Sequence, residues 1–232
     1  DKEPDRAREL TASGIESLLA SAGAEDAEAV ERTLLDLGAL ARESGDLRAA
    51  RAAGEALVER RQARLESDHP DLAATRAILA GTLRALGELA EARALQEQVL
   101  AALERTLPTE HADVNAARSS LAYTLREQGE LALAHELEVH VLAEYERTLP
   151  PDHPLLESAR ENLAITLASA GDLMSARELF ERVLAARERS LAEDDLEIAK
   201  VRANLAVVLF MLGDLPGARR LQEQALVVCE RS

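Results

Sequence analysis

Aromatic side chains and cysteine are scarce in this chain of 232 residues. Aromatic residues make up 2% of the sequence, tryptophan is missing, and the one cysteine is Cys229. A single cysteine cannot form an internal disulfide, which is consistent with a reducing compartment. Apolar residues still make up 47% of the chain, so the core must consist of leucine, alanine and valine. Because helix formers are abundant and β-branched residues sparse, we expect an all-α protein.

Positive charge is also in short supply. The chain has 27 lysines and arginines against 43 aspartates and glutamates, and its formal net charge is −16. Nucleic acids and anionic membrane surfaces attract dense basic patches, so this balance argues against both as partners. No apolar run approaches the ~18–20 residues of a membrane-spanning helix, and we expect no signal peptide. Since the first residue is Asp1 and not methionine, we expect an excised or processed fragment of a cytoplasmic protein.

What the sequence does contain is a repeat with a period of 42 residues. A leucine stands two places after each repeating glycine, and an alanine stands five places after it. The five glycines are Gly45, Gly87, Gly129, Gly171 and Gly213. A constant period of this length is typical of a stacked repeat protein, in which each unit packs on its neighbours.

Apolar residues within each unit recur with helical spacing. In the fourth unit Leu156, Leu163 and Leu167 stand at i, i+7 and i+11, which indicates one face of a helix. This unit is therefore predicted to have a first helix over about 154–170, a break at Gly171 and a second helix over about 173–190. The whole pattern predicts five helical hairpins, in units of about 25–65, 66–107, 108–149, 150–191 and 192–232. Residues 1–24 match the repeat weakly and are predicted to form a lone helix that caps the stack or belongs to a preceding unit.

Three histidines recur with the same period in the connectors between units. They are His69, His111 and His153, and the fourth place in this column is Asp195. Zinc requires donors within ~2.0–2.3 Å of one ion, whereas these residues lie about one repeat apart. We therefore interpret them as structural turn residues, and Asp195 as a connector residue suited to helix entry. His135 and His140 are spaced i, i+5, so they diverge on a helix, and we expect no metal there.

An arginine column falls on the core side of the first helices. Its members are Arg76, Arg118, Arg160 and Arg202. An unpaired buried guanidinium is costly, so we expect structural ion pairs with acids of the second helices. Two sets of acids are suitable. One set is Glu97, Glu181 and Glu223, and the other is Glu104, Glu146, Glu188 and Glu230.

The residues expected of an enzyme do not come together in the sequence. Cys229 ends an apolar run, and the last unit contains no histidine to act as its base. The repeating glycines are single and form no phosphate-binding loop. We therefore expect a non-catalytic protein with no cofactor and no metal.

Several of the repeating columns are similar to a known family. The residues of the fourth unit that resemble the tetratricopeptide repeat are Leu163, Ala164, Leu167, Gly171, Leu173, Ala176, Phe180, Val183 and Leu184. The 42-residue period, Asn162 before Leu163, and the Asp152, His153, Pro154 connector look most like the kinesin-light-chain subtype, which is widespread in bacterial multidomain proteins. The resemblance covers about residues 26–231. It implies a right-handed superhelix of α-α hairpins whose first helices form a concave groove that binds peptides or protein segments.

Helical geometry identifies candidate groove residues on the first helices. At ~100° per residue, a stripe opposite the core face faces outward, and it varies between units while the core columns do not. In the family, the asparagine before Leu-Ala projects into the groove, and Asn162 and Asn204 match it. The candidates are Arg84, Tyr123, Arg126, Ser158, Asn162, Ile165, Lys200, Asn204, Val207 and Phe210. They predict a partner segment with apolar anchors and some acidic residues. The alternative is that Tyr123 and Phe210 pack on neighbouring helices.

These observations predict an interaction scaffold or adaptor that binds a protein or peptide. The alternative is a regulatory or autoinhibitory segment of a larger effector, such as a caspase-like protease, a switch ATPase or a kinase. Self-association is a further possibility, because the C-terminal helix carries Leu221, Ala225, Leu226 and Val228 without a visible polar cap.

Overall fold

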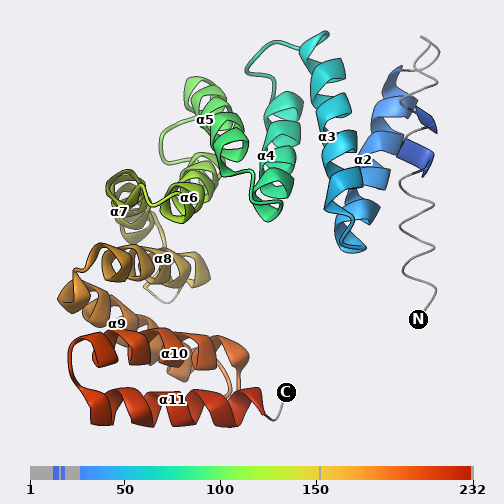
Figure 1. Ribbon diagram of the computed structural model, residues 1–232. Helices are drawn as coiled ribbons and strands as arrows, with labels where there is room; N and C mark the ends of the chain where they lie inside the picture. The colour runs from blue at the N-terminus through green and yellow to red at the C-terminus, as the bar shows by residue number, and fades with distance from the viewer. Residues whose placement is uncertain (1–12, 16, 19–26, 152, 231–232) are drawn as a thin grey trace. The chain divides into compact units, whose positions relative to one another are not determined.

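The computed structural model describes residues 13–15, 17–18, 27–151 and 153–230. Most of the lone helix predicted over 1–24 lies outside these residues, although Ser13, Gly14 and Ile15 are helical and Ile15 is buried. From residue 27 onward, the described chain consists of helices in successive pairs (Figure 1). The first helices are α2 (Ala27–Glu43), α4 (Pro70–Ala85), α6 (Ala112–Glu127), α8 (Pro154–Ala170) and α10 (Leu196–Met211). The second helices are α3 (Leu47–Gln62), α5 (Leu89–Thr106), α7 (Leu131–Thr148), α9 (Leu173–Ser190) and α11 (Leu215–Cys229).

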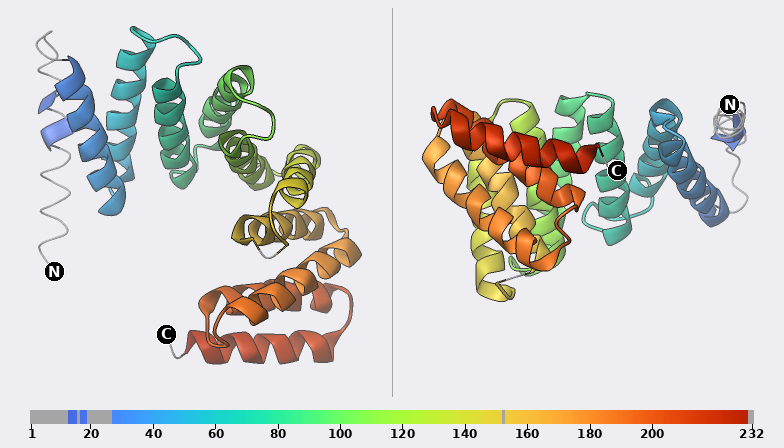
Figure 2. Two further views of the ribbon diagram at one scale, coloured as in Figure 1. Left: turned by 180° about the vertical axis from the view of Figure 1, so that it is seen from behind. Right: turned by 90° about the horizontal axis from the view of Figure 1, so that it is seen from below.

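The predicted all-α class and the succession of helical hairpins are confirmed. The described residues include no strand. The chain forms two compact units, residues 1–124 and 125–232, whose boundary falls within α6. In the first unit α2 packs on α3, α3 on α4 and α4 on α5, and in the second unit successive helices from α7 to α11 pack on one another in the same way. Figure 2 shows the hairpins from two further directions.

The turn inside each hairpin depends on the repeating glycine. All five glycines have a positive φ, between 76° and 89°, a backbone conformation that costs other residues strain. At Gly171 this left-handed residue ends α8 and directs the chain into α9. The residue after it, Asp172, caps α9 by accepting a hydrogen bond from the Ser175 N–H. The period of the glycines is therefore the period of the hairpins.

The connector histidines lie immediately before α4, α6 and α8 and cap these helices, which agrees with their interpretation as structural turn residues. Nδ1 of His69 accepts a hydrogen bond from the Asp71 N–H at 3.1 Å, and Nδ1 of His153 accepts one from the Leu155 N–H at 3.2 Å. His111 makes the same contact at the start of α6. In the fourth connector a carboxylate oxygen of Asp195 takes this place. A side-chain acceptor at this position satisfies a backbone donor that the helix leaves without a partner.

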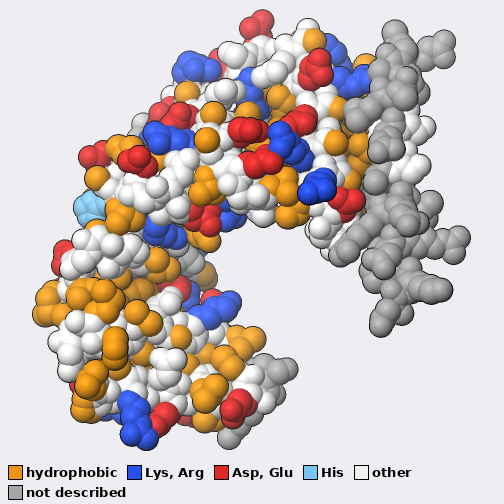
Figure 3. All heavy atoms as spheres, viewed as in Figure 1, with side chains coloured by type: hydrophobic (Ala, Val, Ile, Leu, Met, Phe, Trp, Pro, Cys, Tyr) orange, Lys and Arg blue, Asp and Glu red, His pale blue; other side chains and the backbone are white. Residues whose placement is uncertain are grey.

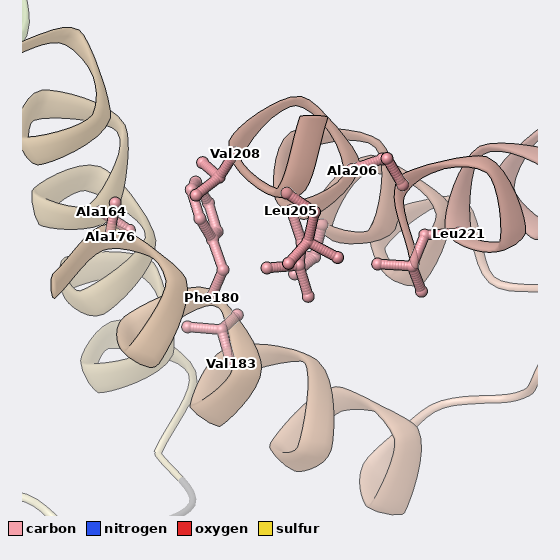
Figure 4. Close-up of a cluster of buried hydrophobic side chains, with 11 residues drawn as sticks. Ala164, Ala176, Phe180, Val183, Leu205, Ala206, Val208 and Leu221 are labelled. Carbon is pink, nitrogen blue, oxygen red and sulfur yellow. The ribbon is translucent and has the colours of Figure 1, made fainter. Parts of the chain in front are cut away.

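Small residues let the helices pack closely around a few large side chains. In the second unit, Phe180 is 1% exposed and belongs to a cluster of buried residues from α8, α9, α10 and α11 (Figure 4). Ala164 and Ala176 are fully buried in the same cluster, which allows α8 and α9 to approach each other. Leucine, valine and alanine make up the rest of this core, as the composition predicts.

The arginine column forms the expected ion pairs, and it uses the second set of acids. Arg118 reaches Glu104 at 2.7 Å, and Arg202 reaches Glu188 at 2.8 Å. Arg160 and Glu146 pair in the same way at 3.3 Å. Arg76 differs, because the residue fourteen places before it is Gln62 and not glutamate. It donates instead to the Ser67 carbonyl at 3.0 Å, and burial lowers its pKa.

Candidate functional site

A cleft of about 1070 Å³ lies within the first unit. Residues of α4 and α6 form its walls and residues of α5 form its floor. Its width follows from small side chains, since Ala77 and Gly81 line it from α4 and Ala116 lines it from α6. Val99 supplies an apolar surface on the floor. We call this feature the first-unit cleft.

Two of the predicted groove residues meet in the wall of the first-unit cleft. The guanidinium carbon of Arg84 on α4 lies 4.4 Å from the ring centroid of Tyr123 on α6. This distance is typical of a cation–π contact. Arg84 therefore holds one face of the ring. Because Tyr123 is still 40% exposed, part of the ring presents surface to the cleft.

Gln96 in the floor is a residue that the sequence reasoning missed. It is 6% exposed, and its Nε2 donates a hydrogen bond to the Ser120 carbonyl at 3.1 Å. Its Oε1 is buried and accepts no hydrogen bond from the described residues. The feature of the sequence that could have identified Gln96 is its column, in which the residue type differs more between units than it does in the core columns. That column contains Gly54, Gln96, Glu138, Phe180 and Gln222.

The charged side chains of the first-unit cleft are divided between its ends. Asp71 and Asp113 occupy equivalent places in the first turns of α4 and α6 and line the cleft there, together with Asp68. The side chains of Asp71 and Asp113 are 65% and 67% exposed. Arg84 lies in the last turn of α4. One end is therefore acidic and the other carries a cation.

Arg126 differs from its predicted role as a groove cation. Its side chain is 11% exposed and reaches Glu138 of α7 at 2.7 Å. The same guanidinium also donates to the Asn162 carbonyl and to the Thr166 hydroxyl on α8. Burial raises the pKa of Glu138, and the Thr166 hydroxyl and the Arg126 charge act in the opposite direction. The charge of Arg126 is therefore paired inside the second unit, and its contacts join α6, α7 and α8.

The remaining candidates lie on α8 and α10 of the second unit. Ser158 and Lys200 are exposed, and Asn162, Ile165 and Asn204 are half-buried. Ile165 packs against the cluster around Phe180. Lys200 forms an exposed ion pair with Glu197 at 2.5 Å, and this hydrogen bond raises the pKa of Lys200.

The two apolar candidates of α10 lie on the surface. Val207 is 56% exposed and Phe210 is 65% exposed, so the side chain of Phe210 is not packed into a core, contrary to the alternative considered for it. Met211 and Leu215 beside them are also more than half exposed. Hydrophobic side chains of the second unit are visible in Figure 3.

Other kinds of site have little support in the described ranges. There, no three histidine, cysteine, aspartate or glutamate side chains are grouped to hold a metal ion. None of the described helices is both long enough and apolar enough to cross a membrane. Cys229 is an exposed free thiol.

The fold and the cleft together define a protein of stacked helical hairpins. The profile of the tetratricopeptide repeat matches residues 29–105, 113–189 and 155–231. The chain therefore belongs to the tetratricopeptide repeat family. Among curated proteins, none matches its sequence.

Solved structures agree with this family and with its kinesin-light-chain branch. A kinesin light chain-like protein of Podosopora anserina, with nearly identical TPR-like repeats, is 28% identical with a TM-score of 0.74, over 86% of this chain and 95% of that one. BtubC (BKLC) from P. vanneervenii is 20% identical with a TM-score of 0.76, over 100% and 92%. A Rap protein solved in complex with Competence and Sporulation Factor shares the fold at 12% identity and a TM-score of 0.69, over 93% and 58%.

Proposed function

We propose that this protein is a non-catalytic scaffold that binds a peptide or protein segment along its first helices. The observation that carries the proposal is the first-unit cleft, whose volume of about 1070 Å³ is slightly above the usual range of about 300–1,000 Å³ for ligand sites. Its walls present small side chains, with an exposed aromatic ring at one end. A Rap protein of the same fold has been solved with Competence and Sporulation Factor bound, which supports binding by this architecture.

The exposed residues indicate the chemistry of the bound segment. Apolar side chains of the segment would contact Val99 and the alanines of the cleft, and an acidic side chain would lie beside Arg84. In the second unit, Val207 and Phe210 offer further apolar contacts, and Asn162 and Asn204 offer amide groups that can pair with a backbone. Interfaces commonly depend on a few aromatic and arginine residues, so Arg84 and Tyr123 are the residues that we expect to matter most.

The test begins with capture of a partner from the source cell. The captured segment is then produced and titrated calorimetrically against the wild type, Tyr123→Ala and Ala77→Phe. Ala77 is exposed in the wall of the cleft, so phenylalanine there fills the cleft without disturbing a core. We expect each variant to weaken binding at least tenfold, whereas Val139→Ala on the exposed face of α7 leaves it unchanged. Full affinity in both cleft variants would contradict the proposal.

The same experiment addresses the regulatory alternative through the identity of the partner. A captured domain of an effector, whose activity changes when this chain is added, would make the scaffold a regulatory segment. A separate protein or peptide would make it an adaptor.

Of the four apolar residues of α11 that predicted self-association, Leu221, Ala225 and Val228 are buried in the second unit. The exposed Leu226 and its neighbour Val227 favour self-association as a second proposal. Leu226 is 56% exposed and Val227 is 45% exposed. The residue equivalent to Leu226 in the preceding hairpin, Leu184, is half-buried. We expect light scattering at rising protein concentration to show dimers, and Leu226→Gln/Val227→Gln to remain monomeric. A wild-type monomer at high concentration would rule this out.

A further inference from the structure

The charges of the first-unit cleft divide along its length, and this division has a consequence for binding. Asp71 and Asp113 line one end, at equivalent places on two successive first helices. Arg84 lines the other end and lies over the ring of Tyr123. A ligand with a uniform charge would be attracted at one end and repelled at the other. A ligand with opposite charges at its two ends would match both.

The length of the cleft sets the size of such a ligand. Asp71 and Arg84 are thirteen residues apart on α4, which corresponds to about 20 Å at a rise of about 1.5 Å per residue. An extended peptide covers about 3.3 Å per residue. About six residues therefore connect the acidic end to Arg84.

The floor between the two ends provides an independent indication of a ligand. Gln96 is buried there, its orientation is set by the hydrogen bond to the Ser120 carbonyl, and its Oε1 accepts no hydrogen bond from the part of the chain that the structure describes. A buried acceptor without a donor is uncommon in folded proteins. When the Gln96 amide turns its Oε1 towards the cleft, a backbone N–H of an extended segment that enters beside it would supply that donor.

The rest of the lining limits the side chains that fit between the ends. Ala77, Gly81 and Ala116 are exposed in the walls, and Val99 lies in the floor. These surfaces are apolar and leave room for side chains of moderate size. They offer no charged partner to the middle of a segment.

We propose that the first-unit cleft binds an extended segment of about six residues in a single direction, with a lysine or arginine at the Asp71 and Asp113 end and an acidic group at Arg84. The residues between them are uncharged, and one of their backbone N–H groups donates to Gln96. This proposal rests on the proposed function and adds the order of charges that the partner must carry. The net charge of −16 acts in the same sense, because it attracts the basic end from a distance.

The experiment selects displayed random octapeptides against the intact chain and against two variants. The first, Asp71→Asn/Asp113→Asn, removes two charges from the cleft. The second, Glu66→Gln/Glu110→Gln, removes two charges from exposed positions in the same connectors that do not line the cleft. Circular dichroism verifies that both variants keep the helical fold. Each enriched peptide is also measured against Ala77→Phe, which fills the cleft.

We expect the wild type and the Glu66/Glu110 variant to enrich peptides with lysine or arginine at one end and aspartate or glutamate at the other. The Asp71/Asp113 variant loses the basic preference and binds the wild-type peptides about 5- to 20-fold more weakly, as expected for two exposed charge pairs. This loss shrinks as salt is raised. Reversing the order of residues in an enriched peptide weakens its binding to the wild type.

Two results would overturn the proposal, and they have different consequences for the proposed peptide-binding function. If the enriched peptides are lost on Ala77→Phe but carry no basic preference, the order of charges is refuted and the peptide-binding function stands. If binding of every enriched peptide survives Ala77→Phe, the first-unit cleft is not a peptide site, and both proposals fail there.

Discussion

At the scale of single residues, the second unit contains a buried ion pair whose two members are not equally well compensated. Glu138 is 4% exposed, and one of its carboxylate oxygens pairs with Arg126 at 2.7 Å. The other oxygen is buried without a hydrogen bond from the described residues. Burial of an incompletely paired carboxylate disfavours its charged form, so the pKa of Glu138 is raised.

This raised pKa predicts an unusual dependence of stability on pH. The folded protein binds a proton to Glu138 more readily than the unfolded chain does, so protonation favours folding. As the pH falls through the raised pKa towards 4.5, the wild type should gain stability relative to Glu138→Gln, whose side chain never carries the charge. The difference in the free energy of unfolding, measured with urea at several pH values, isolates this group from the other carboxylates. A difference that is constant with pH, or that changes in the opposite sense, would refute the assignment.

At the scale of helices, the second helices differ in how they begin. Asp46, Asp172 and Asp214 each cap a second helix with a side-chain hydrogen bond. Glu88 and Glu130 occupy the same position at α5 and α7 and make no such bond. The extra methylene of glutamate moves the carboxylate away from the backbone N–H groups, which is why aspartate is preferred at this position.

Glu130→Asp should therefore stabilise the protein by about 0.5–1 kcal/mol, because it restores a cap that its sister helices have. Thermal or urea unfolding measures the change. Glu88→Asp is the informative comparison, since Glu88 lies 2.6 Å from Arg51 and the shorter side chain gives up that ion pair for the cap. We expect a smaller gain there. A loss of stability on Glu130→Asp would show that the cap cannot form at α7.

At the scale of the whole molecule, the helices α2–α5 of the first unit and α7–α11 of the second unit each pack mainly on their neighbours in the chain. Within each unit, the strongest contacts join successive helices such as α4 with α5 and α10 with α11. In such a chain, stability is close to a sum of units and nearest-neighbour interfaces. A defect in one interface should then remain local.

Phe180→Ala tests this expectation. Removing a fully buried phenylalanine from a core typically costs about 3–5 kcal/mol, and Phe180 contacts a cluster that spans α8 to α11. We expect hydrogen exchange to accelerate in α8–α11 and to stay unchanged in α2–α4 of the first unit. Uniform acceleration along the chain would mean that the molecule unfolds as one cooperative body.

Short-range sequence features were enough to predict the hairpins. Gly171 requires a positive φ, His153 caps the helix that follows it, and Leu156, Leu163 and Leu167 share one helical face; each of these depends on neighbours within a few turns. Such local requirements repeat unchanged every 42 residues. For this reason, the helix boundaries and the structural role of the histidines could be predicted before the structure was known.

The partners of the buried arginines needed the tertiary structure. The sequence left two sets of glutamates open for the arginine column. Glu97 and Glu181 are already bound to Arg93 and Arg177 on their own helices, each at 2.7 Å, so the arginine column pairs with Glu104 and its equivalents. Pairing within a helix follows from spacing, whereas pairing between helices depends on how two helices face each other.

The candidate site shows the same division. The outward stripe of each first helix follows from the sequence by itself, and so do the hairpin repeat and the acidic charge. Only the tertiary structure decided that Arg126 is neutralised by Glu138, that Arg84 lies over Tyr123, and that Gln96 borders an open cleft. Whether a space between helices is filled depends on the combined volumes and charges of side chains from three helices. The repeat pattern of the sequence does not predict how these side chains combine.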